Sequence, residues 1–190
     1  MVDFTPSTSA PITFDYRSSD VELEHVAHTL RANIRTAGNT IKFNGKVYQL
    51  EQFHFHHRSE HLVAGKSFPL ELHLVHADDK GSIAVVGIFF QVREHANQAL
   101  IPVWSKIPVL AGKHVLTDQV DLRLLRPANS SAWHYRGSLT TPPCSEGVEW
   151  IIMTTMMGIS AAQLQLFTDH YQHNYRPVQT LGNRTVYRIC

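Results

Sequence analysis

The sequence has few of the features that mark several large classes of protein. It holds 2 cysteines, Cys144 and Cys190, in 190 residues, and their spacing matches no cysteine-based metal site. No apolar run approaches the ~20 residues needed to span a bilayer. The net charge is +1, and no lysine or arginine tract accompanies it. A transmembrane protein is therefore not expected, and neither nucleic acid nor an anionic membrane surface is an expected partner.

The chain also lacks internal repeats, low-complexity segments and interdomain linkers. Residues 1–190 are thus expected to form a single domain with its own core. Hydrophobic residues make up 43% and charged residues 17% of the chain, as in a globular protein. The first residues, MVDFTPSTSAPITF, show neither the charged start nor the apolar middle of a signal peptide. A cytoplasmic location therefore stays open, and an exported form would have lost its signal before residue 1.

Strand patterns dominate the chain and predict a mostly β (α+β) fold with peripheral helices. A hairpin turn is expected at Asn44-Gly45. One helix is predicted to start at the N-cap Ser160 and to reach Tyr171, and a shorter one lies near residues 94–101. The predicted strands cover residues 11–16, 28–34, 40–57, 70–77, 82–92, 120–125, 133–140, 148–155 and 185–189.

Four of the 13 histidines fall within the stretch QFHFHHRSEH, residues 52–61. On a strand, alternation places Gln52, His54 and His56 on one face and Phe53 and Phe55 on the other. The phenylalanines can then anchor the strand in a core while the histidines face a cavity. An isolated His-x-His pattern would more often be a surface feature.

A second stretch, ELHLVH, supplies a third histidine. Glu71 and His73 share one face of the next predicted strand, and the short loop between allows the two strands to pair antiparallel. His73 would then lie beside His54 and His56, and three imidazoles with one open position are typical of catalytic zinc. Gln52 and Glu71 are the candidates to accept the second N–H of a ligand histidine.

A cupin-type metal protein is the alternative metal site. His54-x-His56 followed by Glu60 fits the first cupin motif, in which Glu60 would be a ligand. The second cupin motif has only an imperfect candidate at residues 108–114.

These two stretches, together with YRGSLTTPPCSEGVEW, resemble the α-class carbonic anhydrases, and the resemblance covers nearly the whole chain. It implies a large, central, mainly antiparallel twisted β-sheet with a zinc ion at the floor of a conical cavity. It also implies reversible hydration of carbon dioxide to bicarbonate and a proton through zinc hydroxide. Carbonic anhydrases are themselves the standard example of zinc activating water at neutral pH.

The resemblance assigns a role to each matching residue. His54, His56 and His73 are similar to the zinc ligands. Thr140 resembles the threonine that accepts a hydrogen bond from the zinc hydroxide. Its own hydroxyl would then donate a hydrogen bond to the Glu60 carboxylate. Thr141 would face the substrate.

The resemblance also implies an apolar wall for carbon dioxide and a proton shuttle. The shuttle falls on His28, with His25 as its competitor, because imidazole suits proton transfer near neutral pH. His57, His61 and His76 are interpreted as structural or solvent-facing. The expected wall consists of Val75, Val85, Leu139, Val148 and Trp150.

Family members normally begin with a further segment, which this chain does not show. The resemblance is to the bacterial or exported type and implies a periplasmic or secreted protein. Its absent segment would hold the partner of Cys144, so Cys144 is expected to lack that partner. Exposed apolar surface there predicts a homodimer. Sulfonamide-type and anion inhibitors are expected ligands, and a catalytically silent carbonic-anhydrase-like binding module is the non-enzyme alternative.

Overall fold

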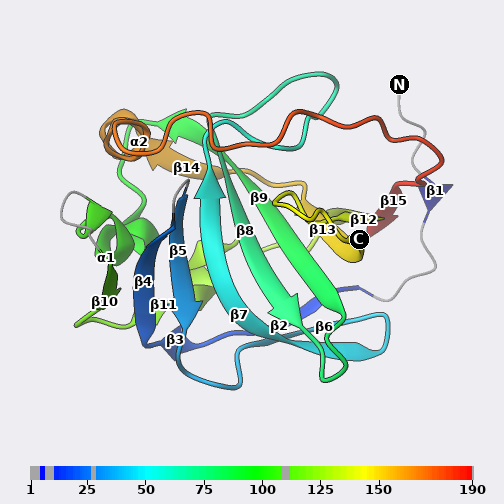
Figure 1. Cartoon of the computed structure of the whole chain (residues 1–190), viewed down its shortest axis with the longest axis horizontal. Helices are drawn as coiled ribbons and strands as arrows, with labels where there is room; N and C mark the ends of the chain where they lie inside the picture. The colour runs from blue at the N-terminus through cyan, green and yellow to red at the C-terminus, as the bar shows by residue number, and fades with distance from the viewer. Residues whose placement is uncertain (1–4, 7–10, 27–28, 108–111, 190) are drawn as a thin grey trace.

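The computed structural model describes residues 5–6, 11–26, 29–107 and 112–189. Most elements are strands of one large twisted sheet, with short helices at its periphery (Figure 1). The sheet has 13 strands, and its central path runs β1-β15-β12-β13-β9-β8-β7-β5-β4-β10. The predicted fold class is therefore confirmed.

The strand bounds follow the chain in order. They are β1 (Thr5–Pro6), β2 (Thr13–Asp15), β3 (Ser18–Ser19), β4 (Val21–Val26), β5 (Thr29–Ile34), β6 (Thr40–Phe43), β7 (Lys46–His56), β8 (Leu70–Ala77), β9 (Ile83–Arg93), β10 (Lys113–Val115), β11 (Val120–Asp121), β12 (Ala132–Ser138), β13 (Glu146–Met153), β14 (Met157–Ser160) and β15 (Tyr187–Ile189). The helices are α1 (Ile101–Trp104) and α2 (Ala161–Thr168), with 3₁₀ helices at Gln98–Leu100 and Leu122–Leu125.

Most neighbouring strands are antiparallel. Strands β7 and β8 form such a pair, and so do β8 and β9. The exceptions are β9 with β13, β9 with β14, and β1 with β15, which run parallel. The sheet is thus mixed, and the predicted "mainly antiparallel" description holds for most of its strand pairs, including the unbroken antiparallel run from β9 to β10.

Several local predictions are confirmed and others are wrong. The hairpin of β6 and β7 turns at Asn44-Gly45, and both residues have positive φ. Helix α2 starts after Ser160, which forms a capping box with Gln163. The strand predicted at 120–125 ends after two residues, because the Asp121 side chain accepts from Arg123 N and caps a 3₁₀ helix. Strand β4 was not predicted, since its outward residues are charged.

The two faces of the sheet bury unequal cores. Phe53 and Phe55 of β7 and Leu72 of β8 belong to the larger cluster on one face. The opposite face carries a smaller cluster around Phe89 and Trp150. The residues that alternate with Phe53 and Phe55 are therefore directed to the less densely packed face.

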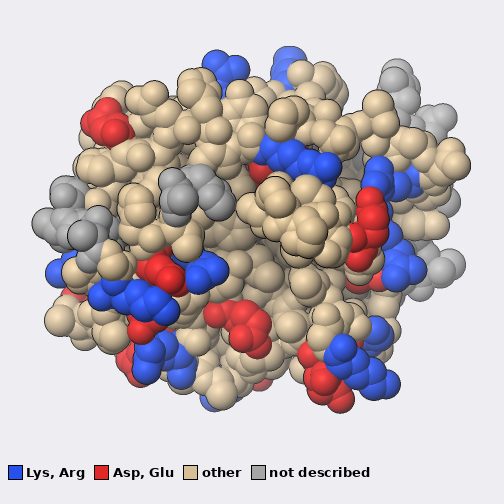
Figure 2. All heavy atoms as spheres, in the orientation of Figure 1, with Lys and Arg blue, Asp and Glu red and all other residues tan. Residues whose placement is uncertain are grey.

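Positive and negative side chains are interspersed on the face drawn in Figure 2. This agrees with the net charge of +1. Among the described residues, no helix has the length and apolar character needed to cross a bilayer.

Candidate active site

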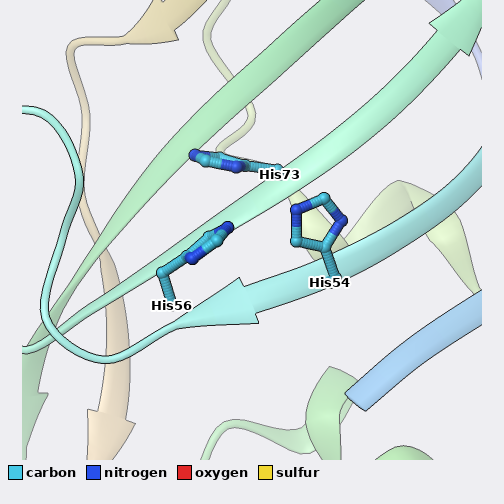
Figure 3. Close-up of side chains that lie close together, drawn as sticks. All are labelled: His54, His56 and His73. Carbon is cyan, nitrogen blue, oxygen red and sulfur yellow. The ribbon is translucent and has the colours of Figure 1, made fainter. Parts of the chain in front are cut away.

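The three predicted ligand histidines meet on one face of the β7–β8 pair. His54 lies directly opposite His73 in the antiparallel register, and His56 follows two residues later on the same face. One nitrogen of each ring lies within 4.8 Å of the others. Figure 3 shows the rings of His54 and His56 from β7 converging with that of His73 from β8. The sequence-based juxtaposition is confirmed.

Each of these rings uses its other nitrogen in a hydrogen bond. His54 Nδ1 donates to Gln52 Oε1 at 2.9 Å, and His73 Nε2 donates to Glu71 Oε1 at 3.0 Å. Gln52 and Glu71, the predicted hydrogen-bond acceptors of the ligand histidines, therefore lie where the sequence placed them. His56 Nδ1 donates to the backbone carbonyl of Asn174 at 2.6 Å, a partner that the sequence did not predict.

These hydrogen bonds place a ring proton on one nitrogen of each imidazole. The other nitrogen carries the lone pair that can bind a metal, and it is Nε2 in His54 and His56 and Nδ1 in His73. His56 Nε2 is buried and has no hydrogen-bond partner among the described residues. Burial, with the neighbouring His73, lowers the pKa of His56 to about 4, so its imidazole is neutral at pH 7. Three imidazoles that are preoriented by these hydrogen bonds, with one nitrogen of each within 4.8 Å of the others, fit a divalent zinc-type ion.

Glu71 is the most heavily bonded side chain of the site. Its Oε2 accepts from the backbone N–H of Glu60 and His61, and its Oε1 accepts from His61 Nδ1 at 2.6 Å as well as from His73. Burial raises the pKa of Glu71, but His61 and His73 outweigh it and hold this pKa well below its ordinary value. Glu71 therefore stays ionised, orients His73 and anchors the loop that carries Glu60.

His61 extends this network to Tyr135. The Tyr135 hydroxyl bonds His61 Nε2 at 2.6 Å, so the interpretation of His61 as a structural residue agrees with its contacts. Gly87, opposite His73, makes room for the network. A Cβ at position 87 would lie 3.0 Å from Glu71 Oε1 and 2.7 Å from Ile152 Cδ1.

Glu60 has one bonded and one unbonded oxygen. Its Oε1 accepts from the backbone N–H of Arg176 at 2.6 Å. Its Oε2 is buried, lies 3.9 Å from His73 Nδ1, and has no hydrogen-bond partner among the described residues. The predicted hydrogen bond from Thr140 is thus not formed at this oxygen. Thr140 and Glu60 do line a common cavity of about 490 Å³.

The predicted apolar wall is assembled in one cluster. Val85, Val148 and Trp150 are its buried members, and Val75 and Leu139 pack against them. The Trp150 ring lies 4.8 Å from the His73 ring between centroids. Val75 and Leu139 are partly exposed, so they are the members of this set that solvent reaches. Thr141 is exposed in the neighbouring loop.

The proton-shuttle prediction falls partly outside the described residues, because His28 is one of those left out. His25 lies on the face of Leu23 and Leu30, opposite to the ligand face, and its Nδ1 bonds the Tyr171 hydroxyl at 2.9 Å. The geometry therefore disfavours His25 as the competitor. Cys144 is a free thiol, and Cys190 also lies outside the described residues.

Two functional contacts were missed because they come from the irregular segment 172–180. Asn174 supplies the acceptor for His56, and Arg176 supplies the donor for Glu60. The sequence does hold a signal, since NYRPVQ resembles a family segment. No local pattern assigns these residues a role, because their partners lie more than 100 positions earlier.

A family model described as eukaryotic-type carbonic anhydrase matches residues 2–190. The chain belongs to this family. A carbonic anhydrase from Neisseria gonorrhoeae is 39% identical over 176 residues, which cover 92% of this chain and 69% of that protein. The structure of a Photobacterium profundum α-carbonic anhydrase superposes with a TM-score of 0.92 at 37% identity, over 98% of this chain and 86% of that one. A Thermovibrio ammonificans α-carbonic anhydrase, solved with the inhibitor sulfanilamide, superposes with a TM-score of 0.90 at 38% identity. The match covers 97% of this chain and 82% of that one.

Membership settles the coarse function. The chain is an enzyme of the carbonic anhydrase family, which hydrates carbon dioxide reversibly to bicarbonate. The cupin interpretation is therefore wrong. The silent-module alternative is not favoured either, since all three ligand positions are histidine.

Proposed function

We propose that this carbonic anhydrase is a zinc enzyme whose metal is held by His54, His56 and His73. The observation that carries the proposal is the convergence of three imidazole nitrogens within 4.8 Å, each on a ring whose other nitrogen is hydrogen-bonded. A zinc ion bound there supplies Lewis-acid chemistry that makes water a nucleophile at neutral pH, an effect for which carbonic anhydrases are the standard example.

The neighbouring residues would orient the reactants. Glu60 Oε2 is the buried acceptor that lacks a partner, and we propose that the Thr140 hydroxyl donates to it in the active enzyme. The Thr140 oxygen would then accept a hydrogen bond from the attacking water, while Thr141 contacts bicarbonate. Carbon dioxide is apolar, and the exposed edges of Val75 and Leu139 offer it a matching surface.

Proton release is proposed to use His28, on the basis of the family resemblance. An imidazole with an ordinary pKa near 6.5 exchanges protons with solvent at neutral pH. The His28→Ala variant should lose turnover mainly in weak buffer, and small imidazole buffers should restore it. Equal turnover of variant and wild type in weak buffer would remove His28 from the mechanism.

The central test combines metal analysis with a hydration assay. The purified protein should carry about one zinc per chain, and a chelator should abolish carbon dioxide hydration until zinc is returned. Thr140→Ala should bind zinc normally and hydrate carbon dioxide more slowly. Protein with negligible zinc but full activity would contradict the metal assignment.

Further features of the family are proposed for this chain. Sulfonamides should inhibit it, because a sulfanilamide complex of a 38% identical relative is known, and inorganic anions should do the same. We also propose a single cooperatively unfolding domain over residues 1–190, a homodimer, and a periplasmic or secreted location. Calorimetry, light scattering and cell fractionation of the natural host test these three points in turn.

A further inference from the structure

The side chain of Asn174 makes contacts that the ligand bond of its carbonyl does not require. Asn174 Oδ1 accepts from the backbone N–H of His57 at 2.7 Å. Its Nδ2 donates to the backbone carbonyl of Phe55 at 2.8 Å. The side-chain amide of Asn174 therefore bonds the backbone on both sides of His56. The backbone carbonyl of Asn174 accepts a hydrogen bond from the His56 ring.

The same segment carries the partner of Glu60. Arg176 N–H, two residues after Asn174, donates to Glu60 Oε1 at 2.6 Å. Residues 172–180 form no helix or strand in which a backbone ladder would fix their position. Side-chain bonds must therefore do so, and the Arg176 side chain adds one to Ser138 Oγ at 3.2 Å.

We infer that the Asn174 amide is a positioning clamp, which locks segment 174–176 onto the end of β7 and so sets the orientation of His56 and Glu60 together. The inference rests on the proposed function, because His56 matters most as a metal ligand. An amide held by two hydrogen bonds has fixed side-chain torsions, and the backbone carbonyl beside it is fixed in turn.

The contacts identify which half of the clamp is harder to replace. The Phe55 carbonyl also accepts from Thr29 Oγ1 at 2.7 Å, so it keeps a partner when the amide is removed. The His57 N–H would lose its Asn174 acceptor. Loss of the amide should therefore loosen the segment at His57 first.

The matched control is Asn39, a buried amide whose oxygen and nitrogen also each bond a backbone group. Its Oδ1 accepts from Arg17 N at 2.8 Å and its Nδ2 donates to the Thr36 carbonyl at 3.1 Å. None of these partners contacts the ligand histidines in the structure as described. Asn39→Ala and Asn174→Ala thus remove equivalent bonds, and only the second lies at the metal site.

The experiment measures zinc affinity by chelator competition and the exchange of the Arg176 amide proton by NMR. Asn174→Ala should weaken zinc binding roughly tenfold, as expected for loss of an outer partner of a metal ligand. It should also accelerate Arg176 exchange. Asn39→Ala should do neither. Unchanged zinc affinity in Asn174→Ala, or an equal loss in Asn39→Ala, would overturn the inference.

A second measurement needs no variant and covers the case in which Asn174→Ala does not fold. In the wild-type protein the amides of His57 and Arg176 should open with the same free energy, because one clamp holds both. Independent opening would contradict the clamp. Wild-type protein that binds no zinc would instead remove the proposed function, so the two failures can be told apart.

Discussion

Strand β8 carries two buried histidines, one on each face, whose ring nitrogens are bonded differently. His73 faces the ligand cluster, and its Nε2 is engaged by Glu71, which leaves Nδ1 for a metal. His76 lies in the core, where Nε2 accepts from the Tyr16 hydroxyl at 2.6 Å and Nδ1 donates to the Ala84 carbonyl at 3.3 Å. Burial alone therefore does not make a histidine a ligand. The number of nitrogens that the protein leaves unbonded decides it.

The earlier interpretation of His76 as structural or solvent-facing is resolved by this comparison. His76 is fully buried, so the structural alternative is confirmed and the solvent-facing one is wrong. Burial lowers its pKa to about 3. His76 is accordingly neutral across the physiological range.

Removing the ligand histidine of β8, His73, should have the largest effect on zinc binding. His73→Ala should lose zinc binding by more than the 10–100-fold typical of an outer partner, and carbon dioxide hydration should fall with it. Zinc content after dialysis and the hydration rate are the measurements. A His73→Ala protein with full zinc content would mean that the metal lies elsewhere.

Changing the carboxylate that orients His73 should have the next largest effect. Glu71→Gln keeps the size of the side chain but removes the negatively charged carboxylate that accepts hydrogen bonds from His73 and His61. We expect a roughly 10–100-fold loss of zinc affinity. The matched control is Tyr16→Phe, which removes the partner of His76 and should leave zinc affinity within twofold of wild type.

Replacing the core histidine, His76, should lower the stability of the protein and leave its zinc binding unchanged. His76→Leu leaves the buried Tyr16 hydroxyl without its acceptor, which should lower the free energy of unfolding by about 1–3 kcal/mol at pH 7. Zinc per folded chain should not change. Urea unfolding and metal analysis of the same preparation distinguish the two effects, and a loss of zinc without a loss of stability would contradict the comparison.

The smallest effect is a change in the pH dependence of stability. The unfolded chain protonates His76 below its ordinary pKa near 6.5, whereas the folded protein resists this down to about pH 3. Stability from this group is thus complete above pH 6.5 and is lost as pH falls, by up to about 1.4 kcal/mol per pH unit. His76→Leu should flatten the slope by that amount. Unfolding midpoints from pH 7 to 5, in chelator, provide the test, and equal slopes would argue against it.

The sequence predicts most of this arrangement because its signals are local. Alternation in β7 and β8, together with a loop short enough to allow antiparallel pairing, predicts that His54 and His73 lie side by side, and the structure places them opposite each other. It also separates His73 from His76. The partners of His76 could not be predicted, because Tyr16 lies 60 positions away and carries no pattern of its own.

The same limit applies to Asn174 and Arg176, whose bonds depend on how an irregular segment docks. It also applies to β4, where Glu22 and Glu24 do not look like buried-strand residues. Their carboxylates are partnered by Arg35, Arg31 and Lys113 from adjacent segments, which makes a charged strand stable there. Such cross-strand partners are known only once the strand order is known.

The β7–β8 pairing has a consequence for the order in which the site is built. All three ligands are present once residue 73 has been synthesised, and a single hairpin brings them together. Asn174, which orients His56, arrives about a hundred residues later. A nascent or C-terminally clipped chain therefore has a full set of ligands but lacks one of their three anchors. The ligand set and the last of its anchors are, for this reason, made at separate times during synthesis.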